Sequence, residues 1–535
     1  MITTMKKRIF AIAGISVALA FGLGSCVGDL EVTPIDENIV LPEDVLNTQA
    51  AFESLLAKCY QGLCCSSSFG PNGSADMDGI DGGFGQYIRA LINMEELSTD
   101  VVTCCWNDGN IADIHNLCWN SSNEFSLSMY YRIYYQISLC NEFIRQSKKA
   151  QFEGYTNKAA YIAEARALRL LSYYHAIDMF GNVPFATEEN SVGSEGPDQI
   201  ERASLFDWME TEATELLDGA DLAEVGKNEY GRADKGLVQM ILAKLYLNAE
   251  IWKGEAMYDK CAPLCETIIS EYPLHSNWAD LFCADNHLFT KNTTYSGDEI
   301  IFVAPQDGLV LQSYGSTNFL VFASTWAVEG DSDDRIMDAS ALGISSGWSG
   351  LSLTGAFTSK FAENDARATF FKGGFSQYID ELRDNIGGSN GWKPMKYRNV
   401  NHDGTAAQAS GFVDVDFPVF RSADAYLMYA ECAACGAADK VKGQKYLNAV
   451  SNRAGIGDLA LTLPNIIDER GRELYLEGHR RQDLIRFGLF TTADYLWELK
   501  GGVIEGTDVA DIYNLYPIPS GELNANGKLS QNEGF

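Results

Sequence analysis

The sequence predicts a mainly α-helical protein, built from stacked helix pairs of the tetratricopeptide type that carry long loops. Segments with helical periodicity recur along most of the chain, and Ala and Leu stand where such helices would cross. Between these segments lie two long stretches rich in Gly, Ser, Asn, Asp and aromatic residues, near 66–120 and 290–410. Long irregular stretches between well-formed helices are usually functional loops, so we expect a loop-rich ligand-binding face there.

The predicted helices follow one another from residue 161 onward. In 161–179 the apolar residues recur on one stripe that includes Ile162 and Leu171, and Gly181 and Pro184 end the helix. Residues 236–249 are apolar on nearly all sides, as expected of a helix that packs against several neighbours. The other predicted helices are 205–217, 257–270, 423–434, 443–453 and 466–489.

The composition is that of a large folded protein with a strongly acidic balance. Of the 535 residues, 46% are apolar and 21% are charged, which suits a chain with a sizeable buried core. Lys and Arg number 40 against 73 Asp and Glu, so the formal net charge is −33. This charge repels phosphate backbones and therefore excludes nucleic acid as a partner, whereas an uncharged ligand meets no such penalty.

The first 26 residues have the layout of an export signal. A basic stretch at 6–8 precedes an uncharged run at 9–23, and Gly24-Ser25-Cys26 closes it. The ending resembles a bacterial lipobox, in which the cysteine is lipidated, for example with palmitate, and becomes the new N-terminus. We therefore predict that residues 1–25 are a signal peptide and that Cys26 anchors the mature chain to a membrane. A retained membrane-spanning helix and ordinary secretory cleavage are the alternatives.

The other twelve cysteines are expected to be buried free thiols. An exported chain permits disulfides, but the neighbouring pairs Cys64-Cys65 and Cys104-Cys105 form no disulfide framework. Cys432 and Cys435 would need two further metal ligands at matching spacing, and the sequence offers none. The six histidines also lack a metal-binding spacing, and His175 is expected to be an interior residue of a helix.

Short phrases, in order along the whole chain, resemble the SusD/RagB family. The phrases are Ala163-Glu164-Ala165-Arg166-Ala167-Leu168-Arg169, Gly181-Asn182-Val183-Pro184, Gly231-Arg232-Ala233-Asp234-Lys235, Asp416-Phe417-Pro418, Glu477-Gly478-His479-Arg480-Arg481, Asp483-Leu484-Ile485-Arg486, Tyr516-Pro517-Ile518-Pro519 and Gln531-Asn532. Glu533 and Phe535 depart from the family's usual ending. The resemblance implies that residues 26–535 form one body on a scaffold of tetratricopeptide-like helix pairs.

The resemblance also implies a function. Members of the family are lipid-anchored surface proteins in the outer membrane of Gram-negative gut bacteria. They cap TonB-dependent, SusC-like transporters and bind glycans or related nutrients without catalysis. We therefore expect a non-catalytic glycan-binding lipoprotein with no catalytic cofactor. The alternatives are a binding protein for a different glycan and a polysaccharide-degrading lipoprotein enzyme.

The loops resemble those of the family's starch-binding member, which implies starch or maltooligosaccharide as the ligand. The matching segments are 81–89, 105–106, 304–315 and 345–348. The residues that the resemblance assigns to the ligand site are Asp81, Arg89, Trp106, Asn110, Tyr314 and Trp348. Asn107 is the alternative to Asn110, because the alignment of this loop shifts by a residue or two.

The chemistry of these residues suits a neutral glucan. Flat aromatic rings cover the apolar C–H faces of sugars, and a few polar groups bind the hydroxyls. Trp106, Tyr314 and Trp348 stand amid small and polar residues in separate loops, and together they would form an arc that fits a curved α-1,4-glucan. Asp81, Arg89 and the loop amide would bind the hydroxyl groups. The alternative for each ring is a place in the core, and the other candidate rings are Trp119, Trp326 and Trp392.

A structural calcium ion is the one cofactor that the sequence suggests. Asp285, Asp414 and Asp416 supply hard oxygen ligands of the kind that calcium prefers, and starch-binding relatives are expected to hold such an ion. A solvated turn is the alternative for these residues.

Two further patterns have structural interpretations. Residues 343–347 match the G-x-S-x-G nucleophile motif, but the sequence lacks a strand before it and a helix after it, so we attribute the match to chance. The charged run at 469–486 predicts a helix with salt-bridged faces and a structural role.

Overall fold

The structure is a computed structural model that describes residues 48–149, 152–190, 196–381 and 390–535. The predicted signal peptide and Cys26 lie outside the described residues. The chain divides into two compact units, Met1–Phe52 and Glu53–Phe535. Only residues 48–52 of the first unit are described, so the account below concerns the second.

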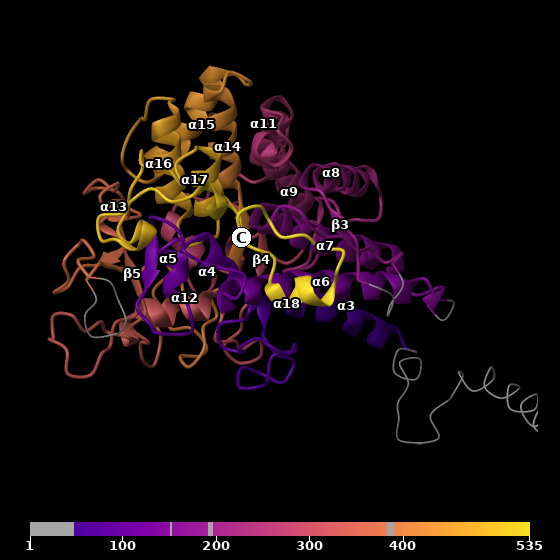
Figure 1. Cartoon of the computed structure of the whole chain (residues 1–535), viewed down its shortest axis with the longest axis horizontal. Helices are drawn as coiled ribbons and strands as arrows, with labels where there is room; N and C mark the ends of the chain where they lie inside the picture. The colour runs from indigo at the N-terminus through magenta and orange to yellow at the C-terminus, as the bar shows by residue number, and fades with distance from the viewer. Residues whose placement is uncertain (1–47, 150–151, 191–195, 382–389) are drawn as a thin grey trace, which may run out of the picture. The chain divides into compact units, whose positions relative to one another are not determined.

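Helices dominate the described part of the chain, as predicted (Figure 1). The α-helices are α3 (Gln49–Cys64), α4 (Tyr87–Glu95), α5 (Ala112–His115), α6 (Glu124–Ser147), α7 (Lys158–Phe180), α8 (Arg202–Asp218), α9 (Lys235–Leu247), α10 (Ala249–Lys253), α11 (Tyr258–Glu271), α12 (Ser316–Ser324), α13 (Gly355–Thr358), α14 (Ser422–Ala434), α15 (Lys440–Arg453), α16 (Leu463–Leu474), α17 (Arg480–Arg486) and α18 (Ser520–Ala525). Short 3₁₀ helices are η2 (Trp278–Phe282), η3 (Asn286–Phe289), η4 (Ser340–Leu342), η6 (Lys500–Gly502) and η7 (Asp511–Asn514).

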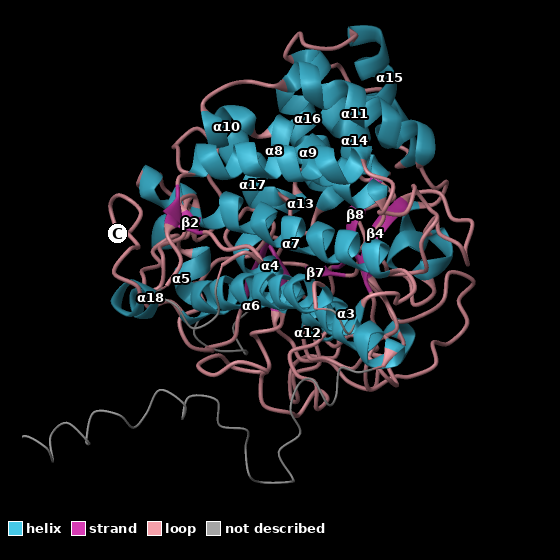
Figure 2. Cartoon of the chain, turned by 90° about the vertical axis from the view of Figure 1, so that its right-hand side faces the viewer, coloured by secondary structure: helices cyan, strands magenta, loops and turns pink. Residues whose placement is uncertain are grey.

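The long helices pack one on the next in chain order. Helix α6 packs on α7, α7 on α8, α8 on α9, α9 on α11, α11 on α14 and α14 on α15. Figure 2 shows them as successive layers between α6 near the bottom and α15 near the top. This serial stacking of neighbouring helices is the arrangement of tetratricopeptide-type pairs, and it confirms the predicted fold class.

Side-chain caps explain where several of these helices begin. Asn123, Asp234, Asp439 and Thr462 each accept a hydrogen bond from a backbone N–H in the first turn of α6, α9, α15 and α16. Helix α7 ends at Gly181, where φ is 67°, as the sequence predicted.

Strands are short and pair in an antiparallel manner. Among the described residues they form four two-stranded sheets. The pairs are β1 (Val102–Cys104) with β5 (Leu351–Leu353), β2 (Val183–Pro184) with β3 (Gln199–Ile200), β4 (Ile300–Ala304) with β8 (Phe417–Arg421), and β6 (Phe370–Phe371) with β7 (Lys393–Pro394).

The prediction of one continuous helix over 466–489 is wrong. The chain leaves the helical conformation after Leu474 and resumes it at Arg480. Between them Leu476 and Gly478 have φ values of 60° and 79°. The Glu96 carboxylate accepts hydrogen bonds from the backbone N–H groups of Gly478 and His479, at 2.8 and 3.3 Å. A side chain distant in the sequence therefore satisfies the backbone groups that the break exposes.

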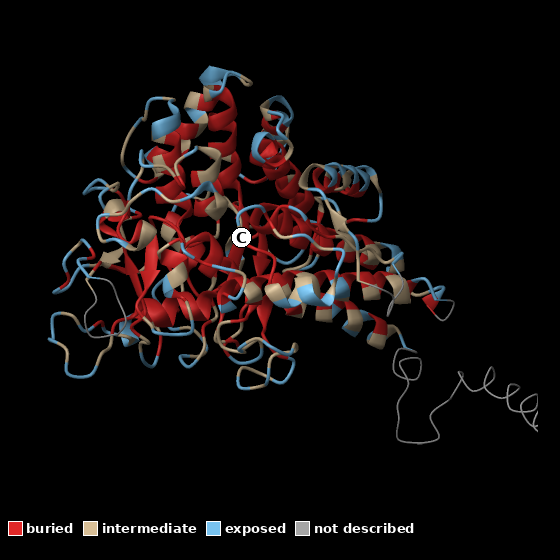
Figure 3. Ribbon diagram, in the orientation of Figure 1, coloured by how far each residue is buried: buried red, intermediate tan, exposed pale blue. Residues whose placement is uncertain are grey.

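The two long stretches contain more regular structure than the sequence predicted. Helix α4 lies in the first, and α12 lies in the second together with β4 to β7. Every residue of α4 and of α12 is buried, and each helix has only nine residues, too few to establish a clear helical period in the sequence. Helix α6 was not identified from the sequence either. Figure 3 shows that the exposed residues gather mainly in the loops and on the outer helix faces.

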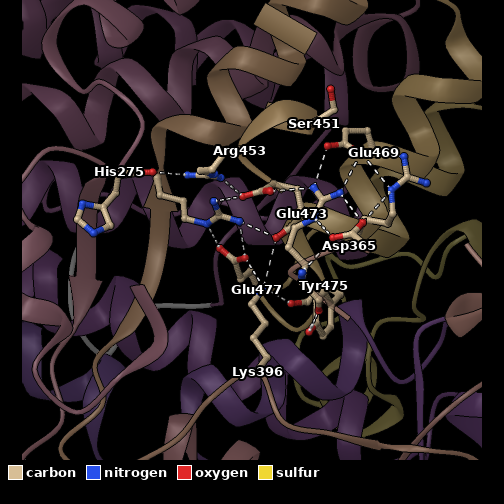
Figure 4. A network of polar contacts seen from close by, with 12 residues as sticks. His275, Asp365, Lys396, Ser451, Arg453, Glu469, Glu473, Tyr475 and Glu477 are labelled. Atoms are coloured by element: carbon tan, nitrogen blue, oxygen red, sulfur yellow. Dashed lines mark hydrogen bonds and ion pairs between the residues drawn. The ribbon is translucent and has the colours of Figure 1, made fainter. Parts of the chain in front are cut away.

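The charged run at 469–486 is structural, as predicted, but its ion pairs are buried and join separate elements. Arg421 contacts Glu299, Glu473 and Glu477 at 2.7, 2.5 and 2.7 Å. Lys396 contacts Glu477 at 2.5 Å, as Figure 4 shows. We call this set, together with Arg367, Arg453, Arg472, Asp365 and Glu469, the ionic network. Within the run, Arg472 also pairs with Glu469 in α16 and Arg486 with Asp483 in α17, each one helical turn apart, in agreement with the predicted salt-bridged helix faces.

Other expectations from the sequence can be checked directly. The twelve cysteines of the described residues are free thiols, and ten of them are buried. His175 is buried, and its Nδ1 lies 2.8 Å from the Tyr87 hydroxyl. Within the described residues, we find no helix that combines the length and the apolar character required to cross a bilayer.

Candidate functional site

Five of the six predicted ligand residues line one open cavity of about 510 Å³. The lining residues are Asp81, Phe84, Arg89, Trp106, Asn107, Asp108, Gly109, Tyr314 and Trp348. Arg89 lies in α4, and the other lining residues lie in loops next to α4, β1, α12 and β5. Helix α12 contacts both α4 and β5 (Figure 1). A larger cavity, of about 660 Å³, lies between α3 and residues 229–232, and it contains none of the predicted residues.

Strand pairing brings the two tryptophans together. Trp106 follows β1 and Trp348 precedes β5, and the antiparallel ladder continues from Cys104 and Leu351 to a bond from Cys105 N–H to the Gly350 carbonyl, 2.9 Å long. Gly350 makes the close approach possible, because a Cβ there would lie 2.6 Å from the Trp106 indole.

Gln86 joins the segments that carry Arg89 and Tyr314. Its Oε1 accepts hydrogen bonds from the N–H of Arg89, at 2.8 Å, and of Ser316, at 3.0 Å. Its amide donates to the Leu63 carbonyl at 2.5 Å. The first bond caps α4, and the second reaches the start of α12, two residues after Tyr314. This buried glutamine therefore sets the position of a cation and a ring that are 225 residues apart in the chain.

The three predicted rings form a continuous, half-buried row. The Trp348 ring centroid lies 6.4 Å from that of Trp106 and 6.0 Å from that of Tyr314. Two buried phenylalanines of α12 support the tryptophans, with Phe319 5.8 Å from Trp106 and Phe322 4.8 Å from Trp348. The Trp106 Nε1–H donates to the Trp348 carbonyl at 3.2 Å. The indoles are thus held by packing on one buried helix.

Polar groups flank the rings. The Arg89 guanidinium lies 5.6 Å from the Trp106 ring and donates to the Gly83 carbonyl at 2.9 Å. Burial lowers the pKa of Arg89 to about 10, although Cys104, Asp108 and Asp81 act in the opposite direction. Arg89 is therefore charged at neutral pH. The exposed Asp81 carboxylate accepts bonds from the N–H groups of Gly83 and Phe84, at 2.7 and 3.1 Å, which fixes its turn.

Asn110 is the predicted ligand residue that does not line the cavity. Its Oδ1 accepts a hydrogen bond from Glu124 N–H at 3.0 Å, and its carbonyl accepts one from the Asn123 amide at 3.0 Å. Asn110 thus fastens the loop to the start of α6. Asn107, the alternative, is exposed and lines the cavity.

Sequence reasoning did not assign Phe84, Asp108 or Gly109 to the cavity, and it also missed the supporting Gln86. Asp108 and Gly109 adjoin Asn107, so the loop that was already chosen pointed to them. Nothing in the sequence around Gln86 distinguishes it from other polar residues.

The other candidate tryptophans have different surroundings. Trp119 and Trp326 are 1% and 0% exposed, and their Nε1–H groups donate to the Leu515 carbonyl and the Asp331 carboxylate. They belong to the core. Trp392 is half-buried beside Phe370 and Lys372 and lies outside the lining of the cavity.

The predicted calcium ligands do not gather. The Asp285 carboxylate contacts His402 at 2.6 Å, and that of Asp414 accepts from the backbone of Gly308 and Gln408. Asp416 is buried and accepts from Gln306 N–H at 2.7 Å, and burial raises its pKa to about 8. In the part of the chain that is described, no group of three or more His, Cys, Asp or Glu residues could hold a metal ion. Backbone N–H groups and a histidine thus occupy the carboxylates that the calcium prediction requires.

The G-x-S-x-G match has no catalytic setting. Residues 343–347 follow the 3₁₀ helix η4 and lead to β5, whereas the motif requires a strand before it and a helix after it. Ser345 is exposed, and its N–H donates to the Ser410 carbonyl at 3.0 Å. The chance interpretation therefore agrees with the structure.

The fold and the cavity define a helical scaffold protein whose loops present a row of aromatic rings to solvent. The chain belongs to the SusD family. The model of that family matches residues 345–535. Starch-binding protein SusD of Bacteroides thetaiotaomicron is 31% identical over an alignment of 585 residues that covers 100% of both chains. SusD-like protein P25 of Formosa agariphila is 28% identical and covers 70% of this chain and 72% of its own.

Solved structures agree on the fold. Surface glycan-binding protein A from Bacteroides thetaiotaomicron, in complex with laminarihexaose, superposes with a TM-score of 0.67 at 20% identity, covering 90% of this chain and 99% of its own. Surface glycan-binding protein A from Bacteroides uniformis gives a TM-score of 0.69 at 20% identity, covering 91% of this chain and 99% of its own. These relatives are named as binding proteins, in agreement with the prediction that the chain is not an enzyme.

Proposed function

We propose that this protein is a surface lipoprotein that captures starch and maltooligosaccharides and passes them to a TonB-dependent outer-membrane transporter. One observation carries the proposal. Trp106, Trp348 and Tyr314 come from three separate segments and meet in one open cavity, with Asp81 and Arg89 at its edge. Half-buried rings beside a few polar groups are what a sugar chain requires, because its ring faces are apolar and its edges carry hydroxyls.

The inclination of the rings favours a curved ligand. Trp106 and Trp348 are inclined by 49° to each other, and Trp348 and Tyr314 by 59°. A flat, ribbon-like β-1,4-linked chain would lie against only one of these rings at a time. A helical α-1,4-glucan turns along its length and can present a sugar face to each ring in succession.

The relatives support an α-glucan as the ligand and suggest one alternative ligand. The relative that matches across the whole chain is named for starch binding. A structural neighbour was solved with laminarihexaose, a β-1,3-linked and also curved glucan, but it is only 20% identical. Laminarin-type glucan is therefore the second candidate ligand, and the α-glucan remains first.

The proposed location rests on the N-terminal sequence and on the family. Cys26 and the lipobox-like residues before it support a lipid anchor, and acyl chains hold a protein at a membrane without a spanning helix. A tethered binding protein raises the local concentration of a polymer at the membrane. Handover to a SusC-like transporter follows from membership of the family and is part of the proposal.

Affinity electrophoresis tests the ligand. Native gels that contain amylopectin, laminarin, dextran or inulin should retard the wild type most strongly in amylopectin. The double substitution Trp106→Ala and Trp348→Ala should abolish this retardation, whereas Trp392→Ala, a half-buried tryptophan outside the cavity, should preserve it. For maltoheptaose in solution we expect a Kd of about 0.1–1 mM, or about −4 to −5.5 kcal/mol.

Each alternative gives a different result. Retardation by laminarin alone would replace the α-glucan with the β-1,3-glucan. Retardation that survives the double substitution would reject the cavity as the site. Shorter products after incubation with maltoheptaose would show an enzyme and end the binding-only account.

A further inference from the structure

The row of aromatic rings continues beyond the cavity. The ring of Phe412 lies 5.3 Å from that of Tyr314 and is inclined to it by 40°. Phe412 is half-buried, like Trp106, Trp348 and Tyr314, and it lies outside the lining of the cavity. The molecule therefore presents four neighbouring rings in the order Trp106, Trp348, Tyr314 and Phe412.

The segment that carries Phe412 is hydrogen-bonded to α12, the helix that supports the two tryptophans and follows Tyr314. The N–H of Val413 donates to Asn318 Oδ1 at 3.2 Å, and the Thr317 hydroxyl donates to the Val415 carbonyl. Asn318 and Thr317 are buried residues of α12, the helix whose phenylalanines support the two tryptophans. Phe412 therefore has a fixed position relative to the cavity.

The loops that carry Trp348 and Phe412 are also bonded to each other. Ser345 N–H donates to the Ser410 carbonyl at 3.0 Å, three residues before one ring and two residues before the other. Hydrogen bonds therefore fix the Phe412 loop on both sides of the ring, at Ser410 before it and at Val413 and Val415 after it.

Partial exposure distinguishes this row from the ring clusters of the core. Trp119 packs 4.4 Å from Tyr516, and Trp326 packs 5.3 Å from Phe375, but these four residues are all buried. Four adjoining half-buried rings leave apolar surface in contact with water, and contiguous apolar surface of this kind is enriched at binding sites.

A polar group lies beside Tyr314, the neighbour of Phe412 in the row. Asn72 is exposed, and its Oδ1 accepts a hydrogen bond from the Tyr314 hydroxyl at 2.9 Å. Its amide nitrogen is a donor of the type that binds sugar hydroxyls. An amide thus lies beside Tyr314, the ring that adjoins Phe412, as the Asn107 amide lines the cavity beside Trp106.

We propose that Phe412 and Asn72 form an additional sugar subsite, which extends the cavity past Tyr314 and gives the protein a preference for longer glucan chains. The inference rests on the proposed function, because the subsite takes the next sugars of the same chain. A short oligosaccharide fills the cavity, where most of the rings and charges are, and only a longer one reaches Phe412.

Calorimetry with maltotriose and maltoheptaose tests the subsite on wild type, Phe412→Ala and Phe371→Ala. Phe371 is a matched control, because it is half-buried and packs on Phe375 rather than on the row. Phe412→Ala should weaken maltoheptaose binding about three- to tenfold, the value of one ring contact, and leave maltotriose binding unchanged. Phe371→Ala should change neither.

Two results would overturn the subsite. An equal loss of affinity for both oligosaccharides would mean that Phe412 only supports Tyr314, and unchanged affinity for both would mean that it has no part in binding. In either case wild type still binds maltoheptaose, so the proposed function stands. If wild type binds neither oligosaccharide, the proposed function itself fails.

Discussion

The aromatic row and the ionic network differ in charge and in exposure to water. The row consists of neutral rings that are half exposed and rest on α12. The ionic network consists of paired charges, with side chains of Arg421, Glu473 and Glu477 that are at most 1% exposed. Water reaches the first and is excluded from the second, so we expect the row to govern affinity and the network to govern stability.

Ion-pair partners determine the pKa values of the buried groups in the ionic network. Burial alone would raise the pKa of Glu473, but the guanidinium groups of Arg453, Arg421 and Arg367 hold it well below its usual value. Burial likewise opposes the charge of Arg421, and Glu477 and Glu473 more than offset that effect and raise its pKa. Each charge is tolerated only because its partners are present.

The largest expected effect is a loss of stability when one cation is removed from the ionic network. Arg421→Met keeps an unbranched side chain but leaves Glu299, Glu473 and Glu477 with one cation fewer in a dry interior. Breaking a buried pair by removing one partner typically costs about 3–5 kcal/mol of unfolding free energy. Urea unfolding followed by circular dichroism measures the change.

The control for Arg421→Met is an exposed pair. Lys442 contacts Glu266 at 2.5 Å, but their side chains are 55% and 37% exposed. Lys442→Met should leave the unfolding midpoint unchanged, because solvent screens such pairs. Equal midpoints for the two variants would contradict the assigned role of the network. Maltoheptaose affinity of folded Arg421→Met should equal that of wild type.

In the aromatic row, a smaller effect, on ligand affinity, is expected from a substitution at Gly350. The substitution Gly350→Ala changes no ring, but the new Cβ would lie 2.6 Å from the Trp106 indole and must displace it. The φ angle of Gly350 is not positive, so the backbone itself accepts alanine. We expect maltoheptaose affinity to fall about three- to tenfold, measured by calorimetry, because the indole leaves its place in the row.

Gly527→Ala is the matched control for that substitution. Gly527 has open space around it and no positive φ, so affinity and stability should both stay at the wild-type value. Unchanged affinity in Gly350→Ala as well would mean that the position of Trp106 is unimportant for binding.

The contrast between the two regions also explains what the sequence could predict. The convergence of Trp106, Tyr314 and Trp348 could be predicted because aromatic residues amid small polar neighbours are conspicuous in loops, and because the loops resemble a known family. Asn110 does not line the cavity, whereas its predicted alternative Asn107 does, because loop alignments shift by a residue or two. The Asn110 side chain holds the start of α6.

The ionic network could not be assembled from the sequence. Its residues come from 299, 365–367, 396, 421, 453 and 469–477, and no local period links them. For the same reason the long charged run was predicted to be one helix with salt-bridged faces, and its buried partners in other elements were not foreseen. The buried helices α4 and α12 were missed because each has only nine residues, too few to show a clear helical period.

The smallest effect is the one expected from pH on affinity, and it separates binding at the row from the stability of the buried core. Burial, aided by His479 and Lys244, lowers the pKa of His175 to about 3, and burial with Lys244 lowers that of His479 to about 3. In the unfolded chain a histidine has a pKa of about 6.5, so between about pH 6.5 and 3 the unfolded state binds more protons. The free energy of unfolding should therefore fall as the pH drops below about 6.5.

The affinity for maltoheptaose should not decrease along with the free energy of unfolding. The indole and phenyl rings and the sugar hydroxyls carry no group that titrates between pH 5 and 9, and Arg89, with a pKa of about 10, stays mostly charged over this range. We expect the Kd for maltoheptaose to vary less than about twofold from pH 5 to pH 9, while urea midpoints decrease from pH 7 to pH 5. Calorimetry and urea unfolding in the same buffers make the comparison. If the Kd rises in step with the loss of stability, the cavity depends on the titrating core, and the separation of binding from scaffold is wrong.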